Sequence, residues 1–166
     1  MTARLTFAGS VVCFLLALVS AGLLLPAEVP LHFGGSGEPD RWGSRTEALV
    51  TMGLGGGLLA LLLGGGAALV DMVPVVHLNV PHKAWWIATP ARERRVRSMM
   101  RTDLYAIAAA TMLLLVVVVV ATTGAARSED PALGPLFLAG LACYLTFVTG
   151  WTAWSLRTRY RPRTDT

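Results

Sequence analysis

The chain has 166 residues, of which 54% are hydrophobic and only 14% are charged, whereas soluble domains average about 25% charged residues. This deficit excludes an ordinary soluble domain. The net charge of +4 favours contact with anionic lipid rather than with nucleic acid.

Four stretches of the chain carry no charge: residues 5–25, 48–70, 104–123 and 133–156. Each has about the 20 residues that a helix needs to cross a hydrocarbon core of about 30 Å. A charge in the middle of such a helix costs about 2.5–3.5 kcal/mol. The sequence therefore predicts an all-α polytopic membrane protein with four transmembrane helices. No residue pattern in it indicates a cofactor. Alternatively, the first stretch is a cleaved signal peptide, which leaves three helices.

The basic residues are distributed unevenly around these stretches. Eleven of the 14 lysines and arginines precede the first stretch, lie between the second and the third, or follow the fourth. By the positive-inside rule, both termini and the central segment then lie in the cytoplasm, an N-in, C-in topology in the cytoplasmic membrane.

This topology predicts the organisation of the chain. The expected parts are a first helical hairpin (1–73) with an outer loop (26–46), a basic cytoplasmic segment (74–102), a second transmembrane hairpin (103–157) and a basic tail (158–166). The tail is expected to be disordered, as chain termini without packing partners usually are.

The basic segment contains signals for the start of a helix. Thr89 followed by Pro90 fits an N-cap and the first helical position. Residues 91–100 mix apolar and basic positions, and Glu93 and Arg97 have the spacing of an ion pair. We expect a short interfacial helix that runs into the third transmembrane helix and binds anionic headgroups. Alternatively, the arginines only set the topology.

The second stretch is rich in glycine. Gly53 and Gly57 are spaced so that a neighbouring backbone can approach closely, and an unwound segment lining a substrate path is the alternative. Asp71 lies at the end of this helix that disfavours a carboxylate. We expect a cationic partner, Arg101 or Arg157, and the alternative is a carboxylate that couples ions.

Two expectations concern the second hairpin. Asp103 is expected to cap the third transmembrane helix, because a helix N-terminus favours a carboxylate. Phe147, Trp151 and Trp154 recur along one face of the fourth helix, which predicts an aromatic belt at the cytoplasmic interface.

The outer loop is the most informative part of the chain. His32, Glu38 and Asp40 are metal-ligand types, but their spacing matches no established zinc or calcium motif. Pro39 and Asp40 favour a turn, so we expect a structural turn and no metal, with metal binding or ligand recognition as alternatives. The residues expected to contact a ligand or partner are Pro30, His32, Phe33, Gly37, Glu38, Pro39, Asp40 and Trp42.

The same loop resembles a family signature. After Leu-Pro, Val-Pro and His-Phe, it reads Gly-Glu-Pro-Asp-Arg-Trp-Gly-Ser at residues 37–44. This order is similar to that of the bacterial family of unknown function called DUF1648. Asn79, Pro81, Lys83 and Trp86 resemble a cytoplasmic element of longer members. The family of immunity and signalling proteins for a sporulation-delaying toxin is related, so the resemblance implies immunity or signalling at the cell envelope.

We find no motif of a hydrolase, a phosphate-binding loop or a zinc enzyme, so no catalytic residue is assigned. The expectation is a non-enzymatic membrane protein that recognises a toxin peptide, a lipid or a partner protein through its outer loop. Four helices enclose little volume, so a homo-oligomer is compatible with this function. The alternatives are a small transporter or channel component that uses the second helix and Asp71, and a membrane enzyme that uses the outer-loop histidine and carboxylates.

Overall fold

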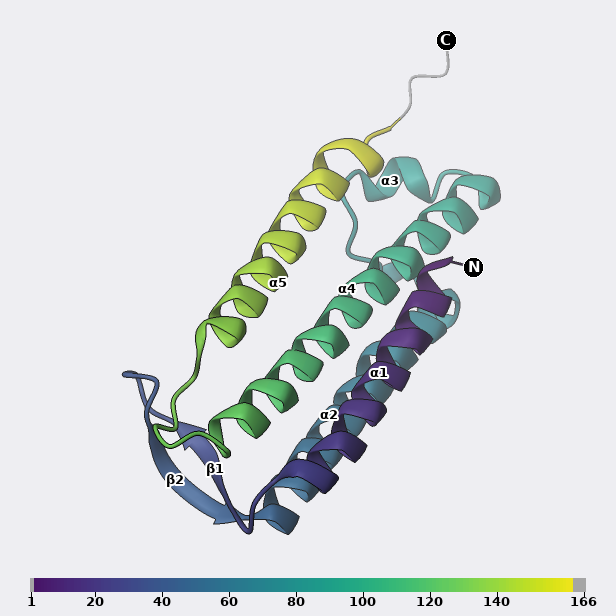
Figure 1. The fold of residues 1–166 in the computed structure, drawn as a ribbon. Coiled ribbons are helices and arrows are strands. Elements are labelled where there is room, and N and C mark those ends of the chain that lie inside the picture. Colours follow the sequence, from purple (N-terminus) through teal and green to yellow (C-terminus); the bar gives the residue numbers. More distant parts are fainter. Residues whose placement is uncertain (1, 163–166) are drawn as a thin grey trace.

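The computed structural model describes residues 2–162. Four long helices lie side by side, and a two-stranded β-hairpin covers one end of the bundle (Figure 1). The elements are α1 (Thr2–Leu24), β1 (Glu28–Phe33), β2 (Pro39–Ser44), α2 (Arg45–Ala68), the short turns η1 (Leu69–Met72) and η2 (Val75–His77), α3 (Lys83–Trp86), α4 (Pro90–Ala125), α5 (Pro135–Trp154) and the π-helical turn η3 (Ser155–Arg159).

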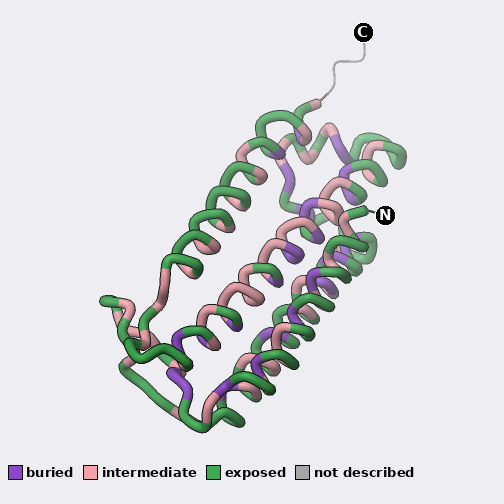
Figure 2. Tube along the Cα trace, viewed as in Figure 1, coloured by how far each residue is buried: buried purple, intermediate pink, exposed green. Residues whose placement is uncertain are grey.

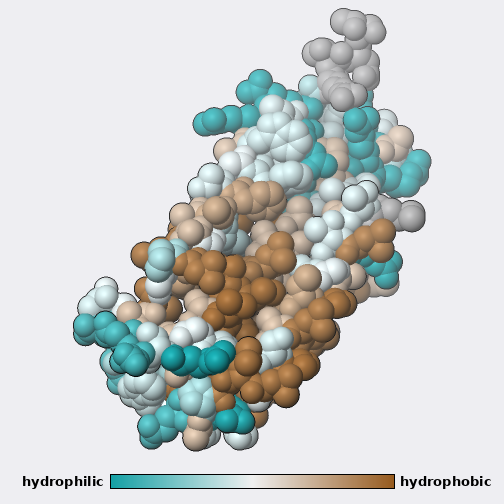
Figure 3. All heavy atoms as spheres, in the orientation of Figure 1, coloured by the Kyte–Doolittle hydropathy of each residue, from teal (hydrophilic) through white to brown (hydrophobic). Residues whose placement is uncertain are grey.

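The four long helices are long and apolar enough to cross a membrane, as the uncharged stretches predict. Large apolar side chains cover their outer surfaces; Leu61 of α2, for example, is 71% exposed. The hydrophobic surface lies in the middle of the molecule and the hydrophilic surface at its two ends (Figure 3). Because an apolar surface of this extent requires a covering, the fold indicates a multi-pass membrane protein.

The two ends of the bundle carry different connections (Figure 1). We call the end with β1, β2 and the α4–α5 connection the hairpin end. We call the opposite end, with the N-terminus, the α2–α4 connection and the residues after α5, the basic end. The start of α1, the basic segment and the described residues after α5 therefore lie at one end, as four spans require.

Helix α4 is the centre of the bundle. It packs against α1, α2 and α5, whereas α5 packs against no other long helix of the described chain. The main buried cluster consists of Phe14, Ala21, Leu25, Val29, Ala48, Met112 and Val119. Helix α5 has no buried residue, and its trace is exposed or intermediate throughout (Figure 2). It is thus a peripheral helix whose outer face is left uncovered by the other long helices described.

Two glycines of α2 accommodate aromatic rings of α1. A Cβ at Gly56 would lie 2.2 Å from Cζ of Phe14, and one at Gly64 would lie 2.5 Å from Cε1 of Phe7. Both distances are shorter than any side-chain contact, so only glycine permits this packing.

The predicted close pair of glycines was wrong in position. A Cβ at Gly57 would meet nothing within 4 Å, and one at Gly53 would make an ordinary contact of 3.9 Å with Leu18. Small residues on a helix permit close approach by side chains as well as by backbones. Here the glycines that make close contacts are those that face the aromatic rings of α1. Helix α2 is continuous through all seven of its glycines, so it has no unwound segment.

The predicted interfacial helix is not a separate element. The predicted N-cap is confirmed, because Thr89 Oγ1 accepts a hydrogen bond of 3.3 Å from the backbone N–H of Arg92. From there α4 runs for 36 residues without a break, or about 54 Å at ~1.5 Å per residue. No glycine or proline occurs between residues 91 and 123, so nothing separates the basic part from the apolar part.

The prediction of a disordered tail was wrong for its first residues. Tyr160 follows the turn η3 and is only 6% exposed. It packs in a second buried cluster with Val80, Trp86 and Val96. The remainder of that prediction, at residues 163–166, lies outside the described residues.

Candidate functional site

The predicted outer loop is an ordered β-hairpin in which β1 pairs antiparallel with β2. Its turn lies at residues 34–37. Gly37 has a φ of 85°, which favours glycine, and its N–H donates to the carbonyl of Gly34 at 2.9 Å. The prediction of a turn at Glu38–Asp40 was therefore wrong, because Pro39 and Asp40 already belong to β2. The glycines supply the turn, and proline is tolerated on an edge strand.

The charged residues of the hairpin form pairs rather than a cluster. Nδ1 of His32 lies 2.5 Å from Oδ1 of Asp40, and Arg41 donates to Glu47 at 2.5 Å. Glu38 joins neither pair. Within residues 2–162, no three histidine, cysteine or acidic side chains lie close enough together to hold a metal ion.

The hairpin is joined closely to the start of α2. Ser44 caps α2, with its Oγ accepting from the N–H of Glu47 at 3.1 Å. A Cβ at Gly43 would lie 2.3 Å from Cδ1 of Leu31 and 2.5 Å from Oε2 of Glu47. The glycine of the Trp-Gly-Ser sequence therefore lets a β1 side chain and an α2 carboxylate approach the β2 backbone.

A pocket of about 390 Å³ lies between the hairpin, α2, α4 and the start of α5. Pro30, His32 and Phe33 contribute to its wall from β1, whereas Arg41 and Glu47 add charge. The other lining residues are Leu31, Ala48, Thr51, Met52, Val118, Thr122, Leu133 and Phe137. A pocket lined by both ionic and apolar groups suits an amphipathic ligand.

The pocket includes only some of the predicted contact residues. Gly37, Glu38, Pro39, Asp40 and Trp42 do not line it. Trp42 lies on the hairpin and is 47% exposed, while the carbonyl of Gly37 accepts from the N–H of Leu133 at 2.9 Å. The sequence did not indicate that α4 and α5 complete the wall, because those residues carry no polar signal.

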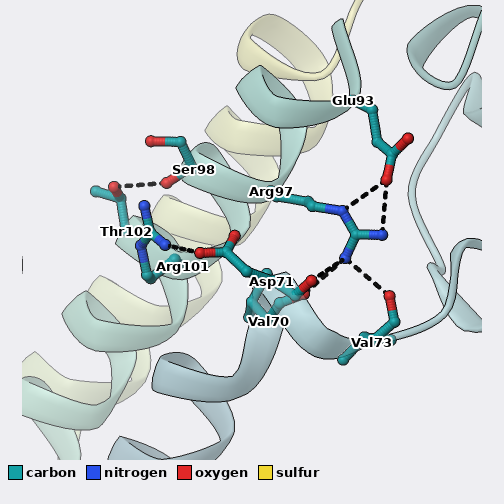
Figure 4. Close-up of polar contacts among 8 residues, drawn as sticks. All are labelled: Val70, Asp71, Val73, Glu93, Arg97, Ser98, Arg101 and Thr102. Carbon is teal, nitrogen blue, oxygen red and sulfur yellow. Dashed lines mark hydrogen bonds and ion pairs between the residues drawn. The ribbon is translucent and has the colours of Figure 1, made fainter. Parts of the chain in front are cut away.

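At the basic end, Arg97 of α4 reaches the end of α2 (Figure 4). Its guanidinium donates to the carbonyls of Val70 at 2.7 Å and Val73 at 2.8 Å. It also donates to Glu93 at 2.9 Å, which confirms the predicted i,i+4 pair. Arg97 therefore binds carbonyls in the turn that directly follows α2, where a cation is favourable because the C-terminal end of a helix carries partial negative charge.

Asp71 lies beside this arginine and forms an ion pair with Arg101 (Figure 4). The prediction of a cationic partner is thus confirmed, with Arg101 rather than Arg157 in that role. The Asp71 side chain is 55% exposed, so it lies at the rim of the bundle.

Asp103 does not cap a helix, and that prediction was wrong. Helix α4 begins 13 residues earlier, at Pro90, so its unpaired amides are far away. Asp103 instead accepts from the Tyr160 hydroxyl at 2.8 Å and from Nε1 of Trp151 at 3.2 Å, and it pairs with Arg159. Burial raises the pKa of Tyr160 well above its ordinary value, and the hydrogen bond to Asp103 raises it further. The tyrosine therefore remains a proton donor.

The predicted cytoplasmic motif holds the α2–α4 connection in place. Trp86 is buried, and its Nε1 donates to the carbonyl of Tyr160 at 3.2 Å. Lys83 donates to the carbonyl of Val76 at 2.7 Å. Asn79 and Pro81 line a small pocket of about 200 Å³ beside Asp103 and Tyr160. Trp86 therefore packs inside the protein.

The stripe of Phe147, Trp151 and Trp154 forms as predicted. Consecutive ring centroids along it are 5.6 Å and 5.4 Å apart. Arg159 lies over the last two rings, 5.9 Å and 5.5 Å from their centroids. Aromatic and cationic groups therefore gather where α5 reaches the basic end.

Comparison with known proteins agrees with the signature in the hairpin. No curated protein and no solved structure matches the chain. Residues 9–55 match the family model described as "Domain of unknown function (DUF1648)". That range includes most of α1, the whole hairpin and the start of α2. The chain therefore carries a DUF1648 domain at residues 9–55, followed by two further long helices.

Proposed function

We propose that the protein is a non-enzymatic, multi-pass protein of the bacterial cytoplasmic membrane that recognises an amphipathic peptide at its hairpin end. Immunity to such a peptide, or signalling of its presence, is the role that this recognition serves. The observation that carries the proposal is the pocket of about 390 Å³ between the hairpin and the helices, which is lined by His32, Arg41 and Glu47 together with apolar side chains.

The hairpin favours a peptide over other amphipathic ligands. Its sheet has two strands in the described part of the chain, so each strand has one edge without a strand partner. An extended peptide can pair with such an edge through main-chain hydrogen bonds while alternate side chains enter a neighbouring pocket.

The hairpin is also fixed in position before any ligand binds. The N–H of Arg45 donates to the carbonyl of Ala27 at 3.1 Å, and the Gly37 carbonyl accepts from Leu133 in the α4–α5 connection. A site that is already ordered loses less conformational entropy on binding, which favours affinity. The DUF1648 domain supplies most of this site, and α4 and α5 complete it.

The transporter alternative receives less support. Helix α2 is continuous, its tight glycines hold rings of α1, and Asp71 is paired at the rim. Intramembrane carboxylates that couple ions usually face a cavity at membrane depth. No observation on residues 2–162 favours transport over recognition.

The test uses the tryptophan at the hairpin. Trp42 belongs to β2, whereas the other four tryptophans lie at the basic end. The protein is reconstituted in lipid nanodiscs and titrated with a panel of secreted, membrane-active peptides. We expect at least one peptide to shift a fluorescence signal that Trp42→Phe removes.

Substitutions in the pocket then separate recognition from general membrane binding. Phe33→Ala and His32→Ala should each weaken binding of the active peptide about 5- to 30-fold, because a central contact contributes one or two kcal/mol to the binding free energy. Leu61→Ala, on the exposed face of α2, is the control and should leave affinity unchanged. Peptide binding that is equal in all variants, or no binding by any peptide of the panel, would refute the proposal.

A further inference from the structure

We propose that one anionic phospholipid binds along the face formed by α4, α5 and α1. Its phosphate lies among arginines at the basic end, and an acyl chain follows the helices towards the hairpin end. This site is independent of the peptide pocket, because none of the pocket residues lines it.

The polar part of the site is a groove of about 620 Å³ at the basic end. Four of the described residues that line it are arginines, namely Arg92, Arg95, Arg159 and Arg161. None of the described lining residues is a carboxylate. Trp85 and Trp154 supply aromatic surface in the same groove. This combination of cations with tryptophan is complementary to an anionic headgroup at a membrane surface.

The arginines of this groove differ in their existing partners. Arg92 lies over the Trp85 ring at 4.1 Å from its centroid, and Arg159 pairs with Asp103. Arg95 and Arg161 are exposed. Neither side chain forms a hydrogen bond or an ion pair within the described part of the chain. Their planar guanidinium groups can each bind a phosphate through two parallel hydrogen bonds.

The apolar part of the site is a second groove, of about 640 Å³, between α1, α4 and α5. Arg95 and Met99 line the polar groove, and Thr102, Ala106 and Leu113 line the apolar one. Successive members of this series are three, four or seven residues apart, so they share one face of α4. The two grooves therefore follow the same side of the bundle.

Helix α5 shows the same continuity. Thr158 and Trp154 line the polar groove, and Phe147, Tyr144 and Gly140 line the apolar one. Figure 1 shows α4 between α1 and α5 over the length of the bundle. Because α5 packs on α4 alone among the long helices described, the groove stays open to lipid from the side.

The dimensions suit one acyl chain. The apolar groove extends along α4 from Thr102 to Val117, about 22 Å at ~1.5 Å per residue. One leaflet of the hydrocarbon core is about 15 Å thick. Ala106, Ala109 and Ala110 form part of the floor, and their small side chains leave space for a chain to lie against α4.

Charge also disfavours a second copy of the protein as the occupant. Two copies have the same orientation in one membrane, so a symmetric contact through this face would place basic end against basic end. The two arginine groups would then meet, which costs free energy. A lipid phosphate instead reduces the repulsion among the arginines.

The test measures lipid binding to the full-length protein in detergent by native mass spectrometry. The probes are dioleoylphosphatidylglycerol, dioleoylphosphatidylcholine with the same chains, and water-soluble glycerol 3-phosphate. We expect selective retention of one phosphatidylglycerol. The double variant Arg95→Gln/Arg161→Gln should lower its affinity about 25-fold, since each arginine near an anionic surface contributes about fivefold.

Matched controls distinguish a site from a diffuse field. Arg94 is adjacent to Arg95 but lines a different groove beside Asp71 and Glu93, so Arg94→Gln should leave phosphatidylglycerol affinity within about twofold. Ala106→Trp should reduce binding by filling the apolar groove, whereas Leu61→Trp should not. Melting temperatures verify that each variant is folded, and the arginine pair tests the site even where Ala106→Trp does not fold.

Three results would overturn the inference. The first is an equal loss of affinity in Arg94→Gln, which would mean attraction by net charge alone. The second is displacement of the lipid by glycerol 3-phosphate at equal concentration, which would mean a phosphate site without a chain site. The third is a dimer in place of the lipid adduct.

Discussion

Arg97 on α4 donates a hydrogen bond of 2.7 Å to the carbonyl of Val70, 27 residues earlier in the turn η1 that directly follows α2. The C-terminal end of a helix carries partial negative charge and unpaired carbonyls, so a cation there is favourable. With the bond to Val73, Arg97 joins the first helical hairpin to the second, and Glu93 on α4 itself accepts from the same guanidinium. A side chain that is 9% exposed can keep its charge only because these acceptors surround it.

Arg97→Met should therefore destabilise the protein strongly. Loss of one partner from a buried charged network costs about 3–5 kcal/mol. Arg97→Lys should restore part of this stability, because lysine keeps the charge without the planar fork of donors. Unfolding in detergent, followed by circular dichroism against temperature or added dodecyl sulfate, measures both variants.

The control for this prediction is Arg94→Met, because Arg94 is exposed and lies only three residues before Arg97 on α4. A surface change of this kind alters stability by about 0.5 kcal/mol or less. If Arg97→Met and Arg94→Met unfold at the same temperature, Arg97 does not hold the two hairpins together.

The two aspartates near the basic end provide a comparison of buried and exposed ion pairs. The side chain of Asp103 is 12% exposed, and that of Asp71 is 55% exposed. Asp103→Asn should therefore cost about 3–5 kcal/mol, whereas Asp71→Asn should cost about 0–1 kcal/mol.

Proteolysis gives a local measurement of the same prediction. Asp103 holds Arg159 and Tyr160, so its loss should free the end of the chain and speed cleavage by trypsin after Arg157 and Arg159. Asp71→Asn should leave the cleavage rate unchanged. Equal cleavage of both variants would show that Asp103 does not anchor this segment.

The raised pKa of Tyr160 predicts a loss of stability in alkali. Because the pKa is raised in the folded state, the stabilisation is complete below the ordinary value of about 10. Above that pH the unfolded chain loses the proton first, and the contribution falls as pH approaches the folded-state pKa. The difference in melting temperature between the wild type and Tyr160→Phe should shrink from pH 9 to pH 11. A constant difference over this range would contradict the assignment.

Local signals were sufficient to predict much of the basic end. The Thr89 cap and the Glu93–Arg97 pair depend on residues three or four positions apart, and both are confirmed. The expectation that Asp71 has a cationic partner, Arg101 or Arg157, followed from the helix dipole, and the structure shows Arg101 in that role. The lengths of the uncharged stretches likewise predicted four helices, although α4 begins at Pro90, well before its uncharged stretch.

The missed features depend on partners far apart in the chain. Asp103 meets residues 48 to 57 positions later, and nothing near it indicates this. The hairpin was expected as an irregular loop, because prolines and glycines hide the alternation that marks a strand. Its pocket needs apolar residues of α4 and α5, and in a membrane protein apolar residues give no signal of position.

Gly56 and Gly57 are adjacent in α2 and should respond oppositely to alanine. A Cβ at Gly56 would overlap the Phe14 ring, and one at Gly57 would meet nothing within 4 Å. Gly56→Ala should cost about 1–3 kcal/mol through overpacking, whereas Gly57→Ala should gain up to about 1 kcal/mol from helix propensity. Detergent unfolding measures both. The double variant Gly56→Ala/Phe14→Leu should recover part of the loss, and no recovery would mean that Phe14 is not the cause.

The orientation of the bundle is the prediction on which access to the peptide pocket depends. Cysteines at Ser36 in the hairpin turn and at Ser98 on α4 report on the two ends, since both positions are exposed. Cys13 and Cys143 are first replaced by alanine to remove background. In intact cells, an impermeant maleimide should label Ser36→Cys, and it should label Ser98→Cys only after the membrane is opened. The positive-inside rule requires this result, because the basic end carries most of the arginines. Labelling of Ser98→Cys from outside, with Ser36→Cys protected, would invert the protein and place the pocket in the cytoplasm, where a secreted peptide does not reach it.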